Sequence, residues 1–204
     1  MFLRQFKESS LANMSYIVAD QESARGVVID PTGELSRMLG TIGSEGLKIE
    51  YILNTHGHPD HTSGNKKLAA ETGARVAAHR SSPVKKDLAL DDVATLKVGR
   101  LDIKVLHTPG HTRDSVCFLV DRRLFTGDTL FVGECGRTDG PGGDAGAMYE
   151  SLFGRLLKLP EDIEVYPGHD YGPRPTSTIG HEKKTNYTLE PRTKEEFVEF
   201  MAEP

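Results

Sequence analysis

The densest group of potential metal ligands in the sequence is the segment Thr55–His61, which reads THGHPDH. Three imidazoles and one carboxylate fall within these seven residues, directly after an apolar run. Neutral imidazole nitrogens and carboxylate oxygens suit zinc or ferrous iron. His56 and His58 are two residues apart, so they point the same way in an extended segment. Asp60 and His61 follow where the chain must turn into a helix. The spacing favours two neighbouring metal positions over a solvated polar loop.

Three later segments can add ligands to the same centre. His111 follows a strand-like run and the turn Pro109-Gly110, which can swing the imidazole out of a sheet. Asp128 and His169 each follow another β-rich run. Each segment alone would be an ordinary turn or surface loop. Together with the histidine-rich segment they indicate one metal centre.

The elements that must position these side chains follow from the apolar periodicity. Strands are predicted at residues 15–19, 26–30, 49–53, 75–79, 95–98, 101–106, 115–120, 123–126 and 163–166. Helices are predicted from about residue 35, from a Thr62 or Ser63 cap to about 71, over 144–159, and after a Thr193–Glu196 capping box. The last helix is expected to bury Phe197, Val198 and Met201, and residues 81–93 to form a surface loop with at most a helical turn. Strands followed by helices in both halves indicate a layered α/β fold.

Length and composition restrict the class of protein. A chain of 204 residues fits one domain, which we place at 1–204. The net charge of −5 argues against a nucleic-acid partner. The sequence contains no signal-peptide pattern and no run long enough to span a bilayer, so we expect no membrane partner and a cytoplasmic location. Cys117 and Cys135 are expected to be reduced thiols. The oligomeric state stays open, with a homo-oligomer as one option.

The histidine-rich segment matches the T-H-x-H-x-D-H signature, and the chain resembles the metallo-β-lactamase-fold superfamily over nearly its whole length. It looks most like the branch of glyoxalase II-like thioester hydrolases and persulfide dioxygenases. The resemblance implies an αββα sandwich with the metal site at one edge, between the two sheets. It also implies that one metal is held by His56, His58 and His111 and a second by Asp60, His61 and His169. Asp128 would bridge the two metals. Asp60 would also orient the reacting hydroxide, and both metals would be divalent zinc or iron.

A second motif, Gly136-Arg137-Thr138-Asp139, resembles a loop beside the metal pocket of persulfide dioxygenases and small glyoxalase II-like enzymes. By the same resemblance, Tyr171 matches a pocket tyrosine. Arg137 and Tyr171 are therefore expected to bind a small thiol-derived substrate, although an internal ion pair of Arg137 is the alternative. Gly140 departs from the phenylalanine usual at that position in the dioxygenases. Cys135 is not expected to be a nucleophile.

The leading hypothesis is a metal-dependent hydrolase, in which a metal-bound hydroxide cleaves the thioester of a small thiol. The alternative is a persulfide dioxygenase that oxidises a glutathione-type persulfide to sulfite. In it, His56, His111 and Asp128 would hold one non-haem Fe(II). A non-catalytic metal-binding module is disfavoured, because Asp60 and Asp128 complete a reactive ligand set. A β-lactamase role is disfavoured by the lack of an export signal. The larger glyoxalase II enzymes carry a longer carboxyl-terminal helical region with basic residues that bind glutathione, and this chain has no room for such a region. Glutathione is therefore not assured as the thiol.

Overall fold

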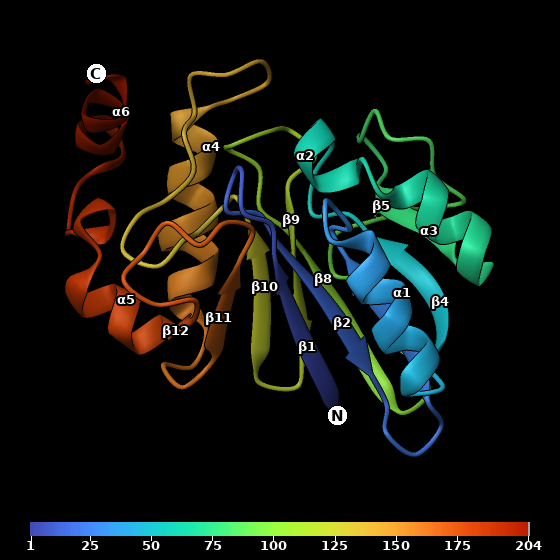
Figure 1. The fold of residues 1–204 in the computed structure, drawn as a ribbon. Helices are drawn as coiled ribbons and strands as arrows, with labels where there is room; N and C mark the ends of the chain where they lie inside the picture. Colours follow the sequence, from blue (N-terminus) through green and yellow to red (C-terminus); the bar gives the residue numbers. More distant parts are fainter. Residues whose placement is uncertain (204) are drawn as a thin grey trace.

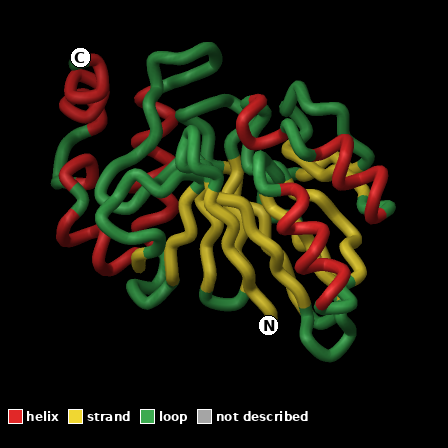
Figure 2. Tube along the Cα trace, viewed as in Figure 1, coloured by secondary structure: helices red, strands yellow, loops and turns green. Residues whose placement is uncertain are grey.

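The computed structural model describes residues 1–203, and the expected domain boundary at Pro204 lies just outside them. Two six-stranded sheets pack face to face between outer helices (Figure 1 and Figure 2). The first sheet has the order β1 (Phe2–Lys7), β2 (Met14–Ala19), β3 (Arg25–Ile29), β4 (Lys48–Leu53), β5 (Arg75–His79) and β6 (Leu88–Leu90). The second has the order β12 (Ser177–Thr178), β11 (Glu164–Pro167), β10 (Arg123–Gly127), β9 (Val116–Val120), β8 (Leu101–His107) and β7 (Thr95–Val98). The αββα prediction is confirmed.

The helices cover the outer faces of the two sheets. The first sheet carries α1 (Leu35–Ser44), α2 (Pro59–Thr62) and α3 (Asn65–Thr72) on its side of the molecule (Figure 1). The second carries α4 (Ala145–Tyr149), the π-helix η1 (Glu150–Arg155), the 3-10 helices η2 (Leu156–Lys158) and η3 (Tyr187–Leu189), α5 (Ile179–Thr185) and α6 (Lys194–Ala202). Over residues 1–203, no helix combines the length and apolarity needed to cross a membrane.

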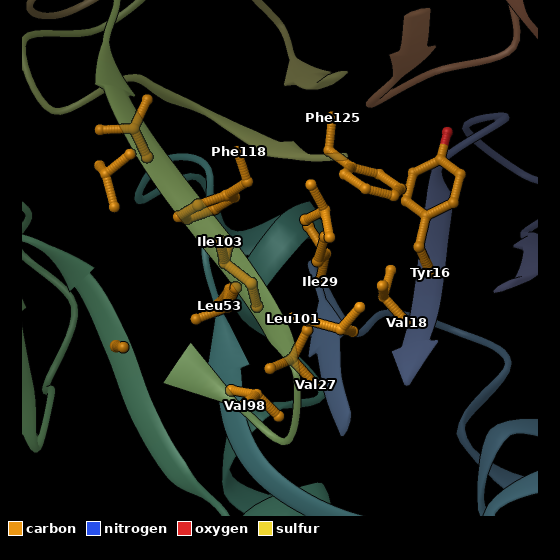
Figure 3. Close-up of a cluster of buried hydrophobic side chains, with 14 of the residues drawn as sticks. Tyr16, Val18, Val27, Ile29, Leu53, Val98, Leu101, Ile103, Phe118 and Phe125 are labelled. Atoms are coloured by element: carbon orange, nitrogen blue, oxygen red, sulfur yellow. The ribbon is translucent and has the colours of Figure 1, made fainter. Parts of the chain in front are cut away.

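The main core fills the space between the sheets. Val18, Val27 and Ile29 of the first sheet point toward Phe118 and Phe125 of the second (Figure 3). Two outer cores form where α1 and α3 pack on the first sheet and where α4 to α6 pack on the second. Both faces of the central strands are therefore buried, which explains their continuous apolar runs. Each such buried side chain contributes roughly 1.5–3 kcal/mol of transfer free energy.

The predicted strands are confirmed to within one or two residues, but some elements differ from the sequence prediction. Strand β1 was not predicted, because its charged residues break the apolar pattern expected of a strand. Residues 81–93 were expected to form a surface loop with at most a helical turn, but Leu88–Leu90 form β6, which pairs with β5. The two-residue strand β12 and helix α5 were also missed.

The helix expected to begin at Thr62 or Ser63 begins later. Thr62 already belongs to α2 and donates its hydroxyl to the carbonyl oxygen of His58 (3.1 Å). Gly64 takes the cap position of α3, without a side-chain hydrogen bond. The predicted end near residue 71 is confirmed, since α3 ends at Thr72 and is followed by Gly73, which caps it with a φ of +73°.

At the carboxyl terminus, the capping box of Thr193 and Glu196 is confirmed. Phe197 is fully buried, but Val198 is 39% exposed, so its predicted burial is wrong. Val198 directly follows Phe197, and successive residues of a helix point in different directions. The predicted helix over 144–159 is present as α4, η1 and η2, and ends before Pro160.

Candidate metal centre

The predicted ligands gather at one edge of the sandwich, where several strands end. The segment that contains His56 and His58 leaves β4, and the loop with His111 leaves β8. Asp128 and His169 follow β10 and β11, which are neighbouring parallel strands and therefore deliver their next residues to the same edge. The structure brings all seven predicted ligands together there.

Three imidazoles form the first ligand group. The Nδ1 atom of His58 lies 2.9 Å from Nε2 of His56 and 3.0 Å from Nε2 of His111. The side chains of His56 and His111 are 1% and 7% exposed, whereas His58 is half-buried. Three ring nitrogens that converge in this way match the donor set of a zinc or iron position.

Asp60, His61 and His169 form the second group. The Nε2 atoms of His61 and His169 are 3.2 Å apart, and they lie 3.6 Å and 3.5 Å from Oδ2 of Asp60. Gly168 allows His61 and Asp128 to lie close to the backbone that carries His169, because a Cβ there would come within 2.9 Å of Cε1 of His61 and 2.4 Å of Oδ1 of Asp128. One carboxylate and two imidazoles make a second complete donor set.

Asp128 lies between the two groups. Its Oδ1 atom is 3.4 Å from Nε2 of His61, and its Oδ2 atom is 3.6 Å from Nε2 of His111 and 3.4 Å from Nε2 of His169. The residue is 8% exposed, and Oδ1 has no hydrogen-bond partner within residues 1–203. A buried, unsatisfied carboxylate oxygen among imidazoles needs a positive partner. The site therefore fits a divalent cation, and Asp128 has the geometry of a bridging ligand.

Hydrogen bonds to protein acceptors fix the tautomers of three imidazoles. The Nδ1–H group of His111 donates to the carbonyl oxygen of Arg137 (2.9 Å), and that of His169 donates to the carbonyl oxygen of Leu11 (2.9 Å). The Nδ1–H group of His61 donates to Oδ2 of Asp30 (3.1 Å). These acceptors place the proton on Nδ1, so the lone pair of each Nε2 faces the metal centre.

Asp30 and Asn13 support the centre but were not among the predicted site residues. Asp30 is 2% exposed and accepts hydrogen bonds from the Thr55 N–H (2.8 Å) and hydroxyl (2.5 Å) in addition to His61. Asn13 donates from Nδ2 to Oδ2 of Asp60 (3.0 Å). Asp30 had a detectable signal, since it is a carboxylate at the end of a predicted strand. Asn13 had none.

The two ligand groups differ in their electrostatics. Burial lowers the pKa of His56 well below its usual value, and burial with the neighbouring His111 lowers that of His58. These imidazoles are neutral at pH 7 and their lone pairs are available. Burial opposes protonation of His61 too, but Asp128 and Asp30 outweigh it and raise the pKa of His61 well above its usual value. A cation that binds His61 must therefore displace a proton.

A cavity of about 280 Å³ opens beside the ligands, with His111, Asp128, Phe131, Arg137 and Tyr171 in its lining. The ring of Tyr171 stacks on His169, with centroids 4.7 Å apart, and is 54% exposed. Burial and the carboxylate of Asp128 raise the pKa of Tyr171, so its phenol remains a hydrogen-bond donor at neutral pH. Arg137 forms an exposed bidentate pair with Asp139 (2.6 and 2.9 Å), which is the internal ion pair considered from the sequence. Both predicted substrate residues thus border the cavity.

Three other histidines take no part in the ligand groups found within residues 1–203, and Cys135 borders the cavity without joining them. His79 and His107 stack on each other, with ring centroids 4.1 Å apart, and His181 lies in α5. Cys135 is buried, and burial raises the pKa of its thiol to about 11. A thiol with so high a pKa contains almost no thiolate at neutral pH, which agrees with the prediction that Cys135 is not a nucleophile.

The fold and the cluster of seven candidate ligands are typical of a metallo-β-lactamase-type domain, and the sequence agrees. Residues 11–86 and 80–169 match the family model described as "Metallo-beta-lactamase superfamily". The chain belongs to this superfamily.

Several known proteins are similar to this chain over most of its length. The chain is 36% identical to persulfide dioxygenase ETHE1, mitochondrial, of Homo sapiens over 98% of this chain and 80% of that protein. The crystal structure of ETHE1 from Myxococcus xanthus has a TM-score of 0.94 and 35% identity, and covers 98% of this chain and 90% of its own. A hydroxyacylglutathione hydrolase of a Polaromonas species is 39% identical over 78% of this chain and 62% of that protein. These relatives are enzymes.

Proposed function

We propose that this chain is a metal-dependent persulfide dioxygenase, which oxidises the terminal sulfur of a small-thiol persulfide to sulfite. The observation that supports it is the extent of the similarity. The persulfide dioxygenases match 98% of this chain, whereas the hydroxyacylglutathione hydrolase matches 78%. This choice reverses the order of preference that the sequence alone suggested. Both activities occur in the family.

In this proposal His56, His111 and Asp128 hold one ferrous iron. Nε2 of His111 lies 3.6 Å from Oδ2 of Asp128, and the rings of His56 and His111 have centroids 5.0 Å apart. When bound by two histidines and one carboxylate, ferrous iron supplies open positions for dioxygen and the persulfide. The Nδ1–H bond of His111 to the Arg137 carbonyl keeps its Nε2 aimed at the centre.

The overall reaction is RSSH + O₂ + H₂O → RSH + SO₃²⁻ + 2H⁺. Both oxygen atoms of O₂ and one from water end on the outer sulfur, and the S–S bond breaks. The two sulfur atoms together lose the four electrons that O₂ gains. The carrier leaves as the free thiol, so the same pocket must first hold the persulfide and then release the thiol.

The cavity has side chains that can hold a thiol carrier. The guanidinium of Arg137 can exchange Asp139 for a substrate carboxylate in the same bidentate geometry. The phenol of Tyr171 can donate to the persulfide. Phe131 packs edge-on against Tyr171, with ring centroids 5.3 Å apart, and limits the access of water to that wall.

Thioester hydrolysis is the second candidate, and the second ligand group favours it. Asp60, His61 and His169 form a complete donor set, and Asp128 contacts both groups, since its Oδ1 atom faces His61 and its Oδ2 atom faces His111 and His169. Two zinc or iron ions bound there would lower the pKa of water and polarise a carbonyl. Asn13 holds Oδ2 of Asp60 (3.0 Å), so this carboxylate is oriented to position the attacking hydroxide.

The proposal treats residues 1–204 as one metallo-β-lactamase-fold domain that acts in the cytoplasm on a small thiol derivative. It includes neither nucleic acid nor a membrane as a partner, in line with the net charge of −5. The proposal is compatible with a homo-oligomer.

The two activities are separated by one experiment. The protein is purified without oxygen and without chelators, and its metals are counted. Glutathione persulfide and a lactoyl thioester are then offered in turn in an oxygen electrode. We expect one iron per chain and one O₂ consumed per sulfite formed, only with the persulfide. Two metals per chain, with thioester cleavage and no oxygen uptake, would instead establish the hydrolase.

A further inference from the structure

The segment between Asp128 and Arg137 is a tight turn that carries part of the cavity wall. Leu130 and Cys135 pair as an isolated bridge, and the N–H of Phe131 donates to the carbonyl oxygen of Glu134 (2.8 Å). Gly133 has a φ of +90° at the tip of this turn. The conformation of residues 130–135 therefore decides where Phe131 and Arg137 lie.

This turn also touches the metal centre directly. A Cβ at Gly136 would lie 1.9 Å from the carbonyl oxygen of Asp128, so the two backbones are in close contact. A Cβ at Gly172, directly after Tyr171, would lie 2.5 Å from the carbonyl oxygen of Val132. The turn is thus packed between the bridging aspartate and the segment that carries Tyr171.

Glu182 of α5 holds the turn from the side away from the ligands. Its Oε2 atom accepts a hydrogen bond from the N–H of Gly133 (2.8 Å). Asn186, one helical turn later, donates from Nδ2 both to Oε2 of Glu182 (2.9 Å) and to the carbonyl oxygen of Glu134 (3.2 Å). Two side chains from α5 and its end therefore bind the backbone of two successive residues, Gly133 and Glu134, at the tip of the turn.

The surroundings of Glu182 are unusual for a residue that only stabilises the fold. Its side chain is 0% exposed, and its Oε1 atom has no hydrogen-bond partner in the described part of the chain. Removing a carboxyl group from water with one oxygen unsatisfied is unfavourable. An apolar side chain at this fully buried position would not carry this penalty.

We propose that Glu182 is a positioning residue for the substrate pocket. It fixes the turn at Gly133 and, through the turn, the placement of Phe131 and Arg137 beside the metals. The effect on substrate rests on the function proposed above, whereas the effect on the turn does not.

The test compares the wild type with Glu182→Ala and Glu182→Gln. Met38→Ala is the matched control. Met38 is a fully buried residue of α1, which lies on the opposite side of the sandwich from α5. The first measurement is the rate at which iodoacetamide modifies Cys135, with the fully buried Cys117 as an internal reference. The second is KM, kcat and metal content with glutathione persulfide and with a lactoyl thioester.

We expect Glu182→Ala to raise both the Cys135 modification rate and KM by about 10-fold, roughly the effect of losing one buried hydrogen bond. Metal content, kcat and Cys117 protection should stay at wild-type levels. Glu182→Gln, which keeps an acceptor for Gly133, should restore most of the wild-type behaviour. Met38→Ala should lower only the melting temperature.

The proposal is overturned if Glu182→Ala leaves the Cys135 rate at that of Met38→Ala, or if it speeds the modification and leaves KM unchanged. If the wild type turns over neither substrate, the proposed function fails. The modification rates alone then decide whether Glu182 fixes the turn.

Discussion

Replacing Asp30 by asparagine should weaken metal binding at Asp60, His61 and His169 while leaving the three-histidine group intact. In the wild type, Oδ1 of Asp30 accepts from the Thr55 N–H (2.8 Å), and Oδ2 accepts from the Thr55 hydroxyl (2.5 Å) and from Nδ1–H of His61 (3.1 Å). Asparagine has only one oxygen, and the Thr55 N–H can only donate. The amide nitrogen must therefore face His61.

An amide NH₂ donates, so it forces His61 to accept at Nδ1 and to carry its proton on Nε2. That proton occupies the lone pair that faces the metals. To bind a metal through Nε2, His61 must return to the tautomer with its proton on Nδ1, and it then loses its hydrogen bond to the residue at position 30. That loss costs about 1–3 kcal/mol, which corresponds to a roughly 5- to 150-fold lower metal affinity. Measured effects of such supporting residues are typically about 10- to 100-fold. Asp30 has a φ of +48°, which asparagine tolerates well, so the backbone is not strained.

The assay loads zinc onto the metal-free protein against a competing chelator, so it measures the affinity of both ligand groups even though the proposed dioxygenase carries one iron. Asp20→Asn is the matched control, because Asp20 is 4% exposed and accepts hydrogen bonds from Ser23 and Arg100 rather than from a predicted ligand. We expect one dissociation constant to rise in Asp30→Asn and neither to change in Asp20→Asn. Wild-type values for both metals in Asp30→Asn, or an equal loss at both, would refute the tautomer argument.

The remaining predictions concern the ligands, the pocket and the thiols. His111→Ala and Asp128→Ala should each lose most bound metal by elemental analysis and keep the wild-type circular dichroism. Arg137→Ala and Tyr171→Phe should raise KM without changing metal content. Unchanged kinetics would mean that Arg137 and Tyr171 have only a structural role. Removing the metals should lower the free energy of unfolding in chemical denaturation, by about 4 kcal/mol if they are normally present at 1,000 times their dissociation constant. Because the pKa of Cys135 is raised to about 11, its native-state modification by iodoacetamide should be slow at pH 8, accelerate as the pH rises and level off above 11.

The clustering of the seven candidate ligands could be predicted from the sequence because their signals are local. Four of them lie within the seven residues 55–61, and the other three each follow a run with clear strand character. Strand ends that meet at one edge of a sheet bring such residues together whatever the loops do. The layered fold could be predicted for the same reason, from the alternation of short apolar runs and helical segments.

The groups that orient the ligands could not be predicted in this way. The carbonyl oxygens of Leu11 and Arg137 fix two imidazoles, and every residue has a carbonyl group, so no residue type marks them. Asn13 reaches Asp60 across 47 positions of the chain, a pairing that only the packed sandwich creates. Glu182 was missed because α5 itself was missed, and a lone glutamate on a short polar helix is normally a solvated side chain.

Each ligand group draws on both sheets, and this links the metal centre to the core of the sandwich. His56 and His58 follow β4 of the first sheet, whereas His111 follows β8 of the second. The supporting bonds also cross between the sheets, since the phenol of Tyr16 in β2 donates to the carbonyl oxygen of Pro167 in β11 (2.6 Å). The separation of the ligands is therefore set by how the sheets pack. Close-packed interiors transmit strain. A substitution that changes the side-chain volume at Tyr16 or at its neighbour Phe125 should therefore shift the metal ligands, although no ligand is replaced.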